Sequence, residues 1–345
     1  MIKPKKIKKG SKIAVISPCW GGPSIYPDIY EKGIKNLEEI FEFEVIEYPT
    51  ARMNAEEIYS NPKLRANDIN NAFSNEEIDA IFVSIGGYES IRILKFLDID
   101  LILKNPKIIM GYSDAVTFLS YLNYKGLVTF HGPAIMAGWA QLQTFDYLAD
   151  YYKEILLENN KENEIKPFSE WSDGYPDWAD KKTLGEVKNL TKNKEGFKWI
   201  QGNKKIVGKL WGGCVEVLNF LNGTDFWPDK EFWNNKILLI ETSEEKPSPA
   251  QVGYIIRNFG IQGILNKISG ILIGRPKGYS DKEKEDLFNI IKTIATEEFN
   301  NPELLIIGNM DFGHTDPNLI LPLGIDVEID PILKKIIIKE EIYRK

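Results

Sequence analysis

The sequence predicts an α/β protein, in which an N-terminal doubly wound parallel-sheet domain precedes a C-terminal domain of mixed β and α character. Apolar runs of strand length alternate with segments of helical periodicity up to about residue 130, which is typical of a parallel sheet with helices on both faces. The 345-residue chain is also long for one hydrophobic core, so we expect two domains.

The N-terminal elements follow from these runs. Strands are predicted at residues 12–18, 43–48, 78–85, 107–110 and 127–130, and helices at residues 27–41, 62–73, a stretch ending at 96, and 115–122. Gly86-Gly87 and Ser113 both follow predicted strands. Ligands of doubly wound sheets bind at the carboxyl ends of the strands, so these residues are candidates for a site.

The alternation of strands and helices changes at about residue 141. A helix is predicted at residues 147–158, and a polar, loop-rich segment follows at 159–205 with the aromatic residues Trp171, Tyr175, Trp178 and Trp199. These rings form either a small local core or a lid over a binding cleft. We therefore expect an N-terminal domain at 1–150, a connection at 151–205 and a C-terminal domain at 206–345.

The C-terminal part again combines strands and helices. A turn at residues 208–214 leads into a helix ending near residue 221, strands are predicted at 236–242, 268–273 and 304–307, and helices at 249–259 and from 280 to 298. Ser280 and Glu283 match a capping box at the start of the last helix. Residues 325–329 and 335–339 should pair as a closing hairpin.

Composition excludes several classes of function. The net charge of -7 argues against a nucleic-acid polymer or an anionic membrane as partner, because both select basic surfaces. The sequence has no apolar run of the roughly 18 to 20 residues that a membrane span needs. Two cysteines, Cys19 and Cys214, are too few for a disulfide framework, so a reduced, cytoplasmic location is expected. Because the only histidines are His131 and His314, we expect no metal and no tightly held cofactor.

Ser113 is the candidate nucleophile. It lies between a predicted strand and a predicted helix, where a hydroxyl is exposed and backbone N–H groups can stabilise an oxyanion. The alternative is that Ser113 or Asp114 merely caps the helix. The motif differs from the α/β-hydrolase elbow, since Ala115 stands where that elbow has a glycine.

A nucleophilic serine needs a base, and a histidine oriented by a carboxylate is the usual one. His314 lies in a glycine-containing loop after a strand, and His131 also follows a strand, so both are candidates. Glu241 ends a wholly apolar strand, where an acid is costly unless it is paired or used. Its alternative role is a salt bridge between domains.

Five short segments together carry a family resemblance: Gly111-Tyr112-Ser113-Asp114, Thr129-Phe130-His131-Gly132-Pro133, Ile240-Glu241-Thr242, Phe312-Gly313-His314-Thr315 and Leu321-Pro322-Leu323-Gly324. In these segments the chain resembles the LD-carboxypeptidase family of serine peptidases, which includes the microcin C immunity peptidases. The segments occur in the family's order over nearly the whole chain. The resemblance implies Ser113 as nucleophile, Glu241 as orienting carboxylate, His314 as base, and a homodimer.

The resemblance also implies an oxyanion hole and a class of substrate. The backbone N–H groups of Gly87 and Asp114 would stabilise the oxyanion, and Gly86, Tyr88 and Trp171 would contact the substrate. The long aromatic segment is similar to that of the microcin-immunity branch, so the favoured activity is cleavage of an aminoacyl-nucleotide amide. The alternatives are a murein tetrapeptide LD-carboxypeptidase acting on a small peptide in cell-wall recycling, and a non-enzymatic small-ligand-binding protein.

Overall fold

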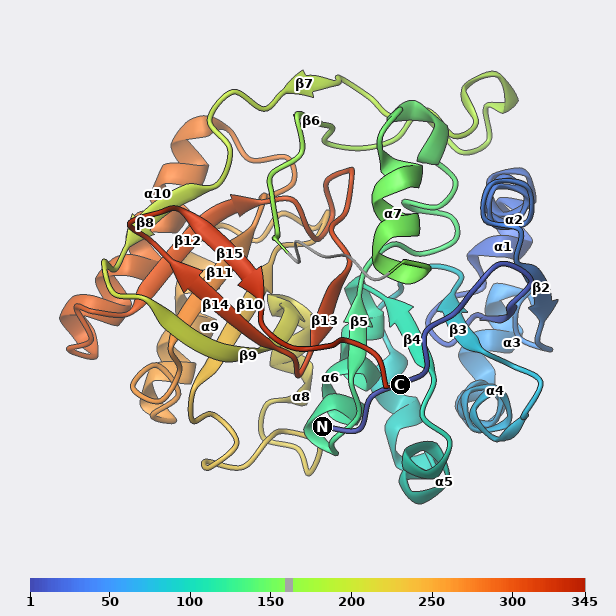
Figure 1. Cartoon of the computed structure of the whole chain (residues 1–345), viewed down its shortest axis with the longest axis horizontal. Coiled ribbons are helices and arrows are strands. Elements are labelled where there is room, and N and C mark those ends of the chain that lie inside the picture. The colour runs from blue at the N-terminus through green and yellow to red at the C-terminus, as the bar shows by residue number, and fades with distance from the viewer. Residues whose placement is uncertain (159–163, 345) are drawn as a thin grey trace.

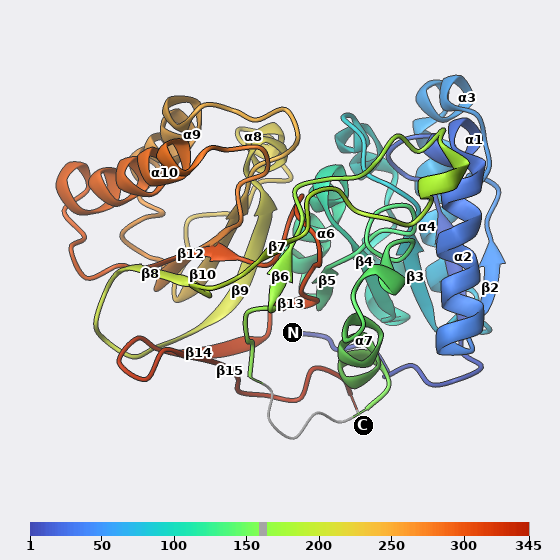
Figure 2. The same cartoon turned by 90° about the horizontal axis from the view of Figure 1, so that it is seen from above.

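The computed structural model describes residues 1–158 and 164–344. In this part of the chain, a six-stranded and a seven-stranded sheet lie side by side (Figure 1), and β6 (Glu170–Trp171) and β7 (Thr191–Lys192) form a further two-stranded sheet. Residues 159–163, at the start of the predicted loop-rich connection, lie outside the described residues. The view in Figure 2 shows helices α9 (Pro249–Ile261) and α10 (Asp281–Thr293) over one sheet, and α2 (Pro27–Phe41) and α4 (Pro62–Ser74) beside the other. The predicted α/β class, with a mostly parallel N-terminal sheet, is confirmed.

The N-terminal sheet contains a strand from the C-terminal part of the chain. Its strands are β1 (Lys12–Ile16), β2 (Glu44–Glu47), β3 (Ala80–Val83), β4 (Ile108–Gly111), β5 (Thr129–His131) and β13 (Leu321–Leu323), in the order β13-β5-β4-β3-β1-β2. Neighbouring strands are parallel except β13, which pairs antiparallel with β5. The remaining helices here are α1 (Gly22–Ile25), α3 (Ala55–Ser60), α5 (Ile99–Lys104), α6 (Val116–Tyr124), α7 (Leu148–Leu156), η1 (Ser90–Phe96), η2 (Ser113–Ala115) and η3 (Leu142–Thr144).

Alternate residues of β1 explain why helices cover both faces of this sheet. Ile13 and Val15 belong to a core with α2, whereas Ala14 and Ile16 belong to a separate core with α4 and α6. Successive side chains of a strand point to opposite faces, so an all-apolar strand must be covered twice. The sheet is therefore doubly wound, as the sequence predicts.

The C-terminal sheet is mixed. Its strands are β8 (Lys198–Gln201), β9 (Ile206–Cys214), β10 (Lys236–Glu241), β11 (Gly270–Gly274), β12 (Leu305–Met310), β14 (Asp326–Asp330) and β15 (Lys335–Ile338), in the order β15-β14-β9-β10-β11-β12-β8. Strands β9 to β12 are parallel, and β8, β14 and β15 are antiparallel to their neighbours. The other elements of the second half are β6 (Glu170–Trp171), β7 (Thr191–Lys192), η4 (Lys181–Thr183), α8 (Val215–Leu221) and the π-helical turn η5 (Ile294–Glu298).

Some local predictions are confirmed and one is wrong. The closing hairpin forms from β14 and β15, and Ser280 and Glu283 make the predicted capping box. Residues 208–214, predicted as a turn, belong to β9 instead. Their glycines signal close packing within a strand, since a Cβ on Gly212 would lie 2.1 Å from the carbonyl oxygen of Leu239.

None of the helices in the part of the chain that the structure describes is both long and apolar enough to cross a membrane.

Candidate active site

Ser113 lies where β4 passes into α6 through the short helix η2. Its φ is +59°, a left-handed conformation that costs a non-glycine residue about 1 to 3 kcal/mol and is common at functional sites. Within the described residues no side-chain hydrogen bond caps η2 or α6, so the capping alternative is not what the structure shows. The strained turn instead directs the Ser113 hydroxyl toward a histidine.

His314 joins Ser113 to Glu241 in a line of short contacts. Its Nε2 lies 3.0 Å from Ser113 Oγ, and its Nδ1 lies 2.7 Å from Glu241 Oε2. Glu241 ends β10 and is 1% exposed, and His314 is 6% exposed. Residues more than 200 positions apart along the chain thus form the Ser–His–Glu arrangement that the sequence predicts.

A glycine allows the His314 loop to approach Glu241. A Cβ on Gly313 would lie 2.6 Å from Glu241 Oε2, and its φ is +101°. Only glycine combines this backbone angle with so close a contact. The residue before His314 therefore decides whether the imidazole can reach the carboxylate.

His131, the other candidate base, lies in β5 behind the site. It is fully buried, and neither ring nitrogen hydrogen-bonds within residues 1–158 and 164–344. Burial, together with the charge of His314, lowers the pKa of His131 to about 3. His131 is thus neutral and packs against the rings of Tyr112 and Phe312.

A second carboxylate contacts the same nitrogen that contacts the serine. Glu244 Oε2 lies 3.1 Å from His314 Nε2, and the Glu244 side chain is 48% exposed. Burial alone would lower the pKa of His314, but the charges and hydrogen bonds of Glu241 and Glu244 raise it to about 10. The two carboxylates therefore favour the doubly protonated imidazolium, in which Nε2–H would donate to Glu244. Sequence reasoning missed Glu244, which stands three residues after Glu241.

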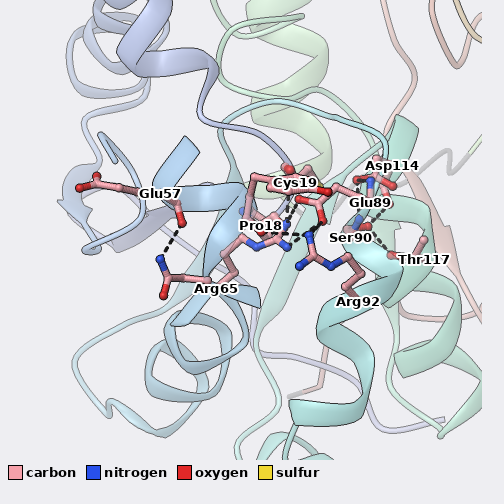
Figure 3. A network of polar contacts seen from close by, with 11 residues as sticks. Pro18, Cys19, Glu57, Arg65, Glu89, Ser90, Arg92, Asp114 and Thr117 are labelled. Atoms are coloured by element: carbon pink, nitrogen blue, oxygen red, sulfur yellow. Dashed lines mark hydrogen bonds and ion pairs between the residues drawn. The ribbon is translucent and has the colours of Figure 1, made fainter. Parts of the chain in front are cut away.

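The Asp114 side chain ties the serine turn to the glycine-containing loop before η1. Its Oδ2 accepts hydrogen bonds from the backbone N–H groups of Glu89 at 3.0 Å and Ser90 at 2.9 Å, and Ser90 Oγ donates to the Asp114 carbonyl at 2.7 Å. Glu89 in turn pairs with Arg65, which is fully buried (Figure 3). Asp114 thus fixes the position of two loops by its side chain, apart from any role of its backbone.

Gly86 touches the serine directly. A Cβ on Gly86 would lie 2.8 Å from both Cβ and Oγ of Ser113, whereas one on Gly87 would lie 3.0 Å from the backbone of Cys19. Glycine is therefore needed so that this loop can lie against the nucleophile. The loop could then present backbone N–H groups to an oxyanion that forms at Ser113.

A cavity of about 260 Å³ opens beside Ser113 and His314. Aromatic rings form much of its wall, and Glu244 and Lys277 supply one charge of each sign. Its lining residues are Trp20, Ile85, Gly86, Gly87, Tyr88, Tyr112, Ser113, Ala137, Tyr175, Trp178, Glu244, Lys277 and His314. The arrangement suits a small molecule with both apolar and charged groups.

The aromatic segment contributes Tyr175 and Trp178 to this cavity, but not Trp171. The rings of Tyr175 and Trp178 lie 5.6 Å apart, and Trp178 also packs on Tyr26. Trp171 lines a separate cavity, where Arg275 lies 4.7 Å from its ring centroid. Trp171 therefore does not line the cavity beside Ser113, because pairing in β6 places it elsewhere, whereas Trp178 does line it.

Among residues 1–158 and 164–344, no group of three or more His, Cys, Asp or Glu side chains is arranged to hold a metal ion.

Comparisons with known proteins agree with this geometry. Residues 13–132 match the model of the LD-carboxypeptidase N-terminal domain, and residues 207–329 match that of the C-terminal domain. The chain belongs to the LD-carboxypeptidase family. The matched regions contain the serine in the first domain and both of its partners in the second, so this is a hydrolase family whose site spans the two domains.

Individual relatives include proteins named for microcin immunity. The chain is 32% identical to the Microcin C7 self-immunity protein MccF of Escherichia coli, over 81% of this chain and 79% of that protein. A solved MccF-like protein from Streptococcus pneumoniae in complex with AMP is 28% identical, with a TM-score of 0.83 over 96% of this chain and 99% of that one. MccF in complex with aspartyl sulfamoyl adenosine is 26% identical, with a TM-score of 0.85 over all of both chains.

Proposed function

We propose that this hydrolase is a serine peptidase that cleaves the amide of aminoacyl-nucleotide compounds through an acyl-enzyme at Ser113. The observation that carries the proposal is the line of contacts from Ser113 through His314 to Glu241, beside a cavity with aromatic walls. A hydroxyl, a base and an orienting carboxylate are the groups that acyl transfer needs.

The first half of the reaction forms the acyl-enzyme. His314 Nε2 removes the proton of Ser113 Oγ, and Oγ attacks the substrate carbonyl carbon. Glu241 stabilises the imidazolium that forms and holds the ring in place. The backbone N–H groups of Gly87 and Asp114 stabilise the oxyanion, and removing one such donor typically costs about 3 to 4 kcal/mol of transition-state stabilisation.

The acyl-enzyme is complete when the His314 imidazolium gives its proton to the departing nitrogen and the amide bond breaks, which leaves Nε2 unprotonated again. The second half releases the amino acid. His314 takes a proton from a water molecule as that water attacks the ester carbonyl carbon, and the imidazolium then returns the proton to Ser113 Oγ as the ester bond breaks. Both halves require an unprotonated His314 Nε2 at their start.

The two ends of the cavity suit the two ends of this substrate. Trp178 and Tyr175 offer ring faces on which a nucleobase can stack, a contact worth about 1 to 3 kcal/mol. Lys277 supplies a cation near the site, which suits a phosphate or sulfamate group. The complexes of relatives with AMP and with aspartyl sulfamoyl adenosine support this substrate class.

Hydrolysis by the purified protein tests the proposal. Aspartyl sulfamoyl adenosine and murein tetrapeptide are each incubated with the protein and with Ser113→Ala, and the products are separated by chromatography. We expect cleavage of the nucleotide compound by the unmodified protein alone. Cleavage of the tetrapeptide instead would favour the murein activity, and a rise in melting temperature without cleavage of either would favour a binding protein.

The homodimer, the cytoplasmic location and the division at residues 150 and 205 stay predictions. Sedimentation analysis of the purified protein would measure the first of these.

A further inference from the structure

Glu244 occupies a place in the site that the triad alone does not require. Its Oε2 lies 3.1 Å from His314 Nε2, and that nitrogen lies 3.0 Å from Ser113 Oγ, so the carboxylate is within about 6.1 Å of the nucleophile. Unlike Glu241, which is buried, Glu244 lines the open cavity. A substrate bound for attack by Ser113 must therefore pass close to this carboxylate.

We propose that Glu244 binds a substrate ammonium group next to the scissile carbonyl, and that this binding releases His314 to act as the base. The inference rests on the proposed function, because an ammonium group next to the scissile carbonyl is a feature of an aminoacyl substrate.

The geometry of an aminoacyl group supports the first half of this proposal. An α-nitrogen is two bonds from the carbonyl carbon, a separation of about 2.5 Å. When that carbon lies about 3 to 3.5 Å from Ser113 Oγ, the nitrogen can reach hydrogen-bonding distance of Glu244 Oε2. An N-acylated residue, as in the interior of a peptide, has no positive charge at this position.

The electrostatics of the cavity support the second half. Without substrate, the cation that balances Glu244 is the His314 imidazolium, and the hydrogen bond from His314 lowers the pKa of Glu244 to about 2. A substrate ammonium can take over that pairing. The Nε2 proton then leaves to solvent, and Nε2 is free to accept the proton of Ser113. A protein that waits in the protonated state would be activated by the substrate charge itself.

The other charged and titratable groups around His314 do not replace Glu244 in this role. Glu241 contacts the opposite ring nitrogen, and Lys277 carries the wrong charge to bind an ammonium. The remaining groups that face His314 or Glu244 are Asp316, His131, Tyr112 and Tyr88. In the described part of the chain, Glu244 is the carboxylate that contacts Nε2 and also lines the cavity.

The test compares two substrates and two variants. The substrates are aspartyl sulfamoyl adenosine with its free α-amino group and the same compound N-acetylated, and the variants are Glu244→Gln and the matched control Glu245→Gln. Glu245 accepts a hydrogen bond from Tyr88 and, within the described residues, has no hydrogen bond or ion pair with His314. Each kcat/KM is measured between pH 5 and pH 10.

We expect the unmodified enzyme and Glu245→Gln to prefer the free amine by about 10- to 100-fold at pH 7, the usual effect of one charged hydrogen bond. In Glu244→Gln the preference should fall to about threefold or less, and the acidic limb of the pH profile should move to lower pH. A merely structural role would shift neither the preference nor the limb.

The contrary results are equally distinct. If Glu244→Gln keeps both the preference and the pH limb, Glu244 does not bind the ammonium and the inference is overturned. If no protein cleaves either compound, the proposed function fails instead. Calorimetric binding of the two compounds to Ser113→Ala, with and without Glu244→Gln, then still decides whether Glu244 recognises the free amine.

Discussion

Replacing Asp114 with alanine should loosen the contact between the serine turn and the loop that contains Gly86. The side chain is fully buried, and its Oδ2 accepts hydrogen bonds from the N–H groups of Glu89 and Ser90. Alanine leaves both donors without that acceptor, and each unsatisfied group costs about 1 to 3 kcal/mol. The free energy of unfolding should therefore fall by about 2 to 6 kcal/mol.

Asparagine at the same position should cost less. Its side-chain oxygen can still accept from the two N–H groups, so we expect a loss of about 1 to 2 kcal/mol. A suitable control is Asp98→Ala, which removes an aspartate that, in the described part of the chain, accepts from one backbone group, the N–H of Leu101 at the start of α5. A lost helix cap of this kind usually costs about 1 kcal/mol.

Urea unfolding, followed by circular dichroism, measures these differences. The expected order of loss is Asp114→Ala first, then Asp114→Asn and Asp98→Ala at similar, smaller values. Activity of folded Asp114→Ala should also fall, because the loop beside the nucleophile is no longer fixed. Equal stabilities for Asp114→Ala and Asp98→Ala would refute the reasoning that the buried carboxylate holds the two loops together.

Three further outcomes follow from the same site. Gly86→Ala should lower kcat by about 100-fold without loss of fold, because the new Cβ would lie 2.8 Å from the nucleophilic oxygen. Steady-state kinetics would measure kcat, and circular dichroism would measure the fold. Trp178→Ala should weaken AMP binding by about 5- to 150-fold and Trp171→Ala should not, as calorimetry would show. Because folding raises the pKa of His314 to about 10, the His314 imidazolium stabilises the fold fully below pH 6.5, and this stabilisation is lost as the pH rises toward 10. The free energy of unfolding of His314→Gln, measured in urea, should therefore lack this decline.

The chemistry of the site was more predictable than its surroundings. Ser113 follows an apolar run, Glu241 ends another, and His314 is one of two histidines, so few combinations were possible. The choice of His314 over His131 depended on the family resemblance. The structure gives a physical reason for it, since β5 buries His131 with no hydrogen-bond partner in the described residues.

Other features depend on contacts that sequence patterns do not encode. Glu244 contacts His314 from the loop that follows β10, and nothing in the local sequence distinguishes it from its neighbour Glu245. The glycines of β9 indicate a turn when only chain neighbours are considered, but they pack against β10 and α6. The placement of Trp178 rather than Trp171 at the cavity likewise follows from tertiary packing.

The most direct test of the account is to detect the covalent intermediate. Turnover of aspartyl sulfamoyl adenosine is stopped with acid within milliseconds, and the intact protein and its peptides are analysed by mass spectrometry. We predict an added aspartyl group on the peptide that contains Ser113, and a strong loss of that adduct in Glu241→Gln, where the imidazole loses its carboxylate partner. The central claim would be contradicted if product formed while the adduct lay on another residue. It would also be contradicted if Ser113→Ala formed product at an undiminished rate.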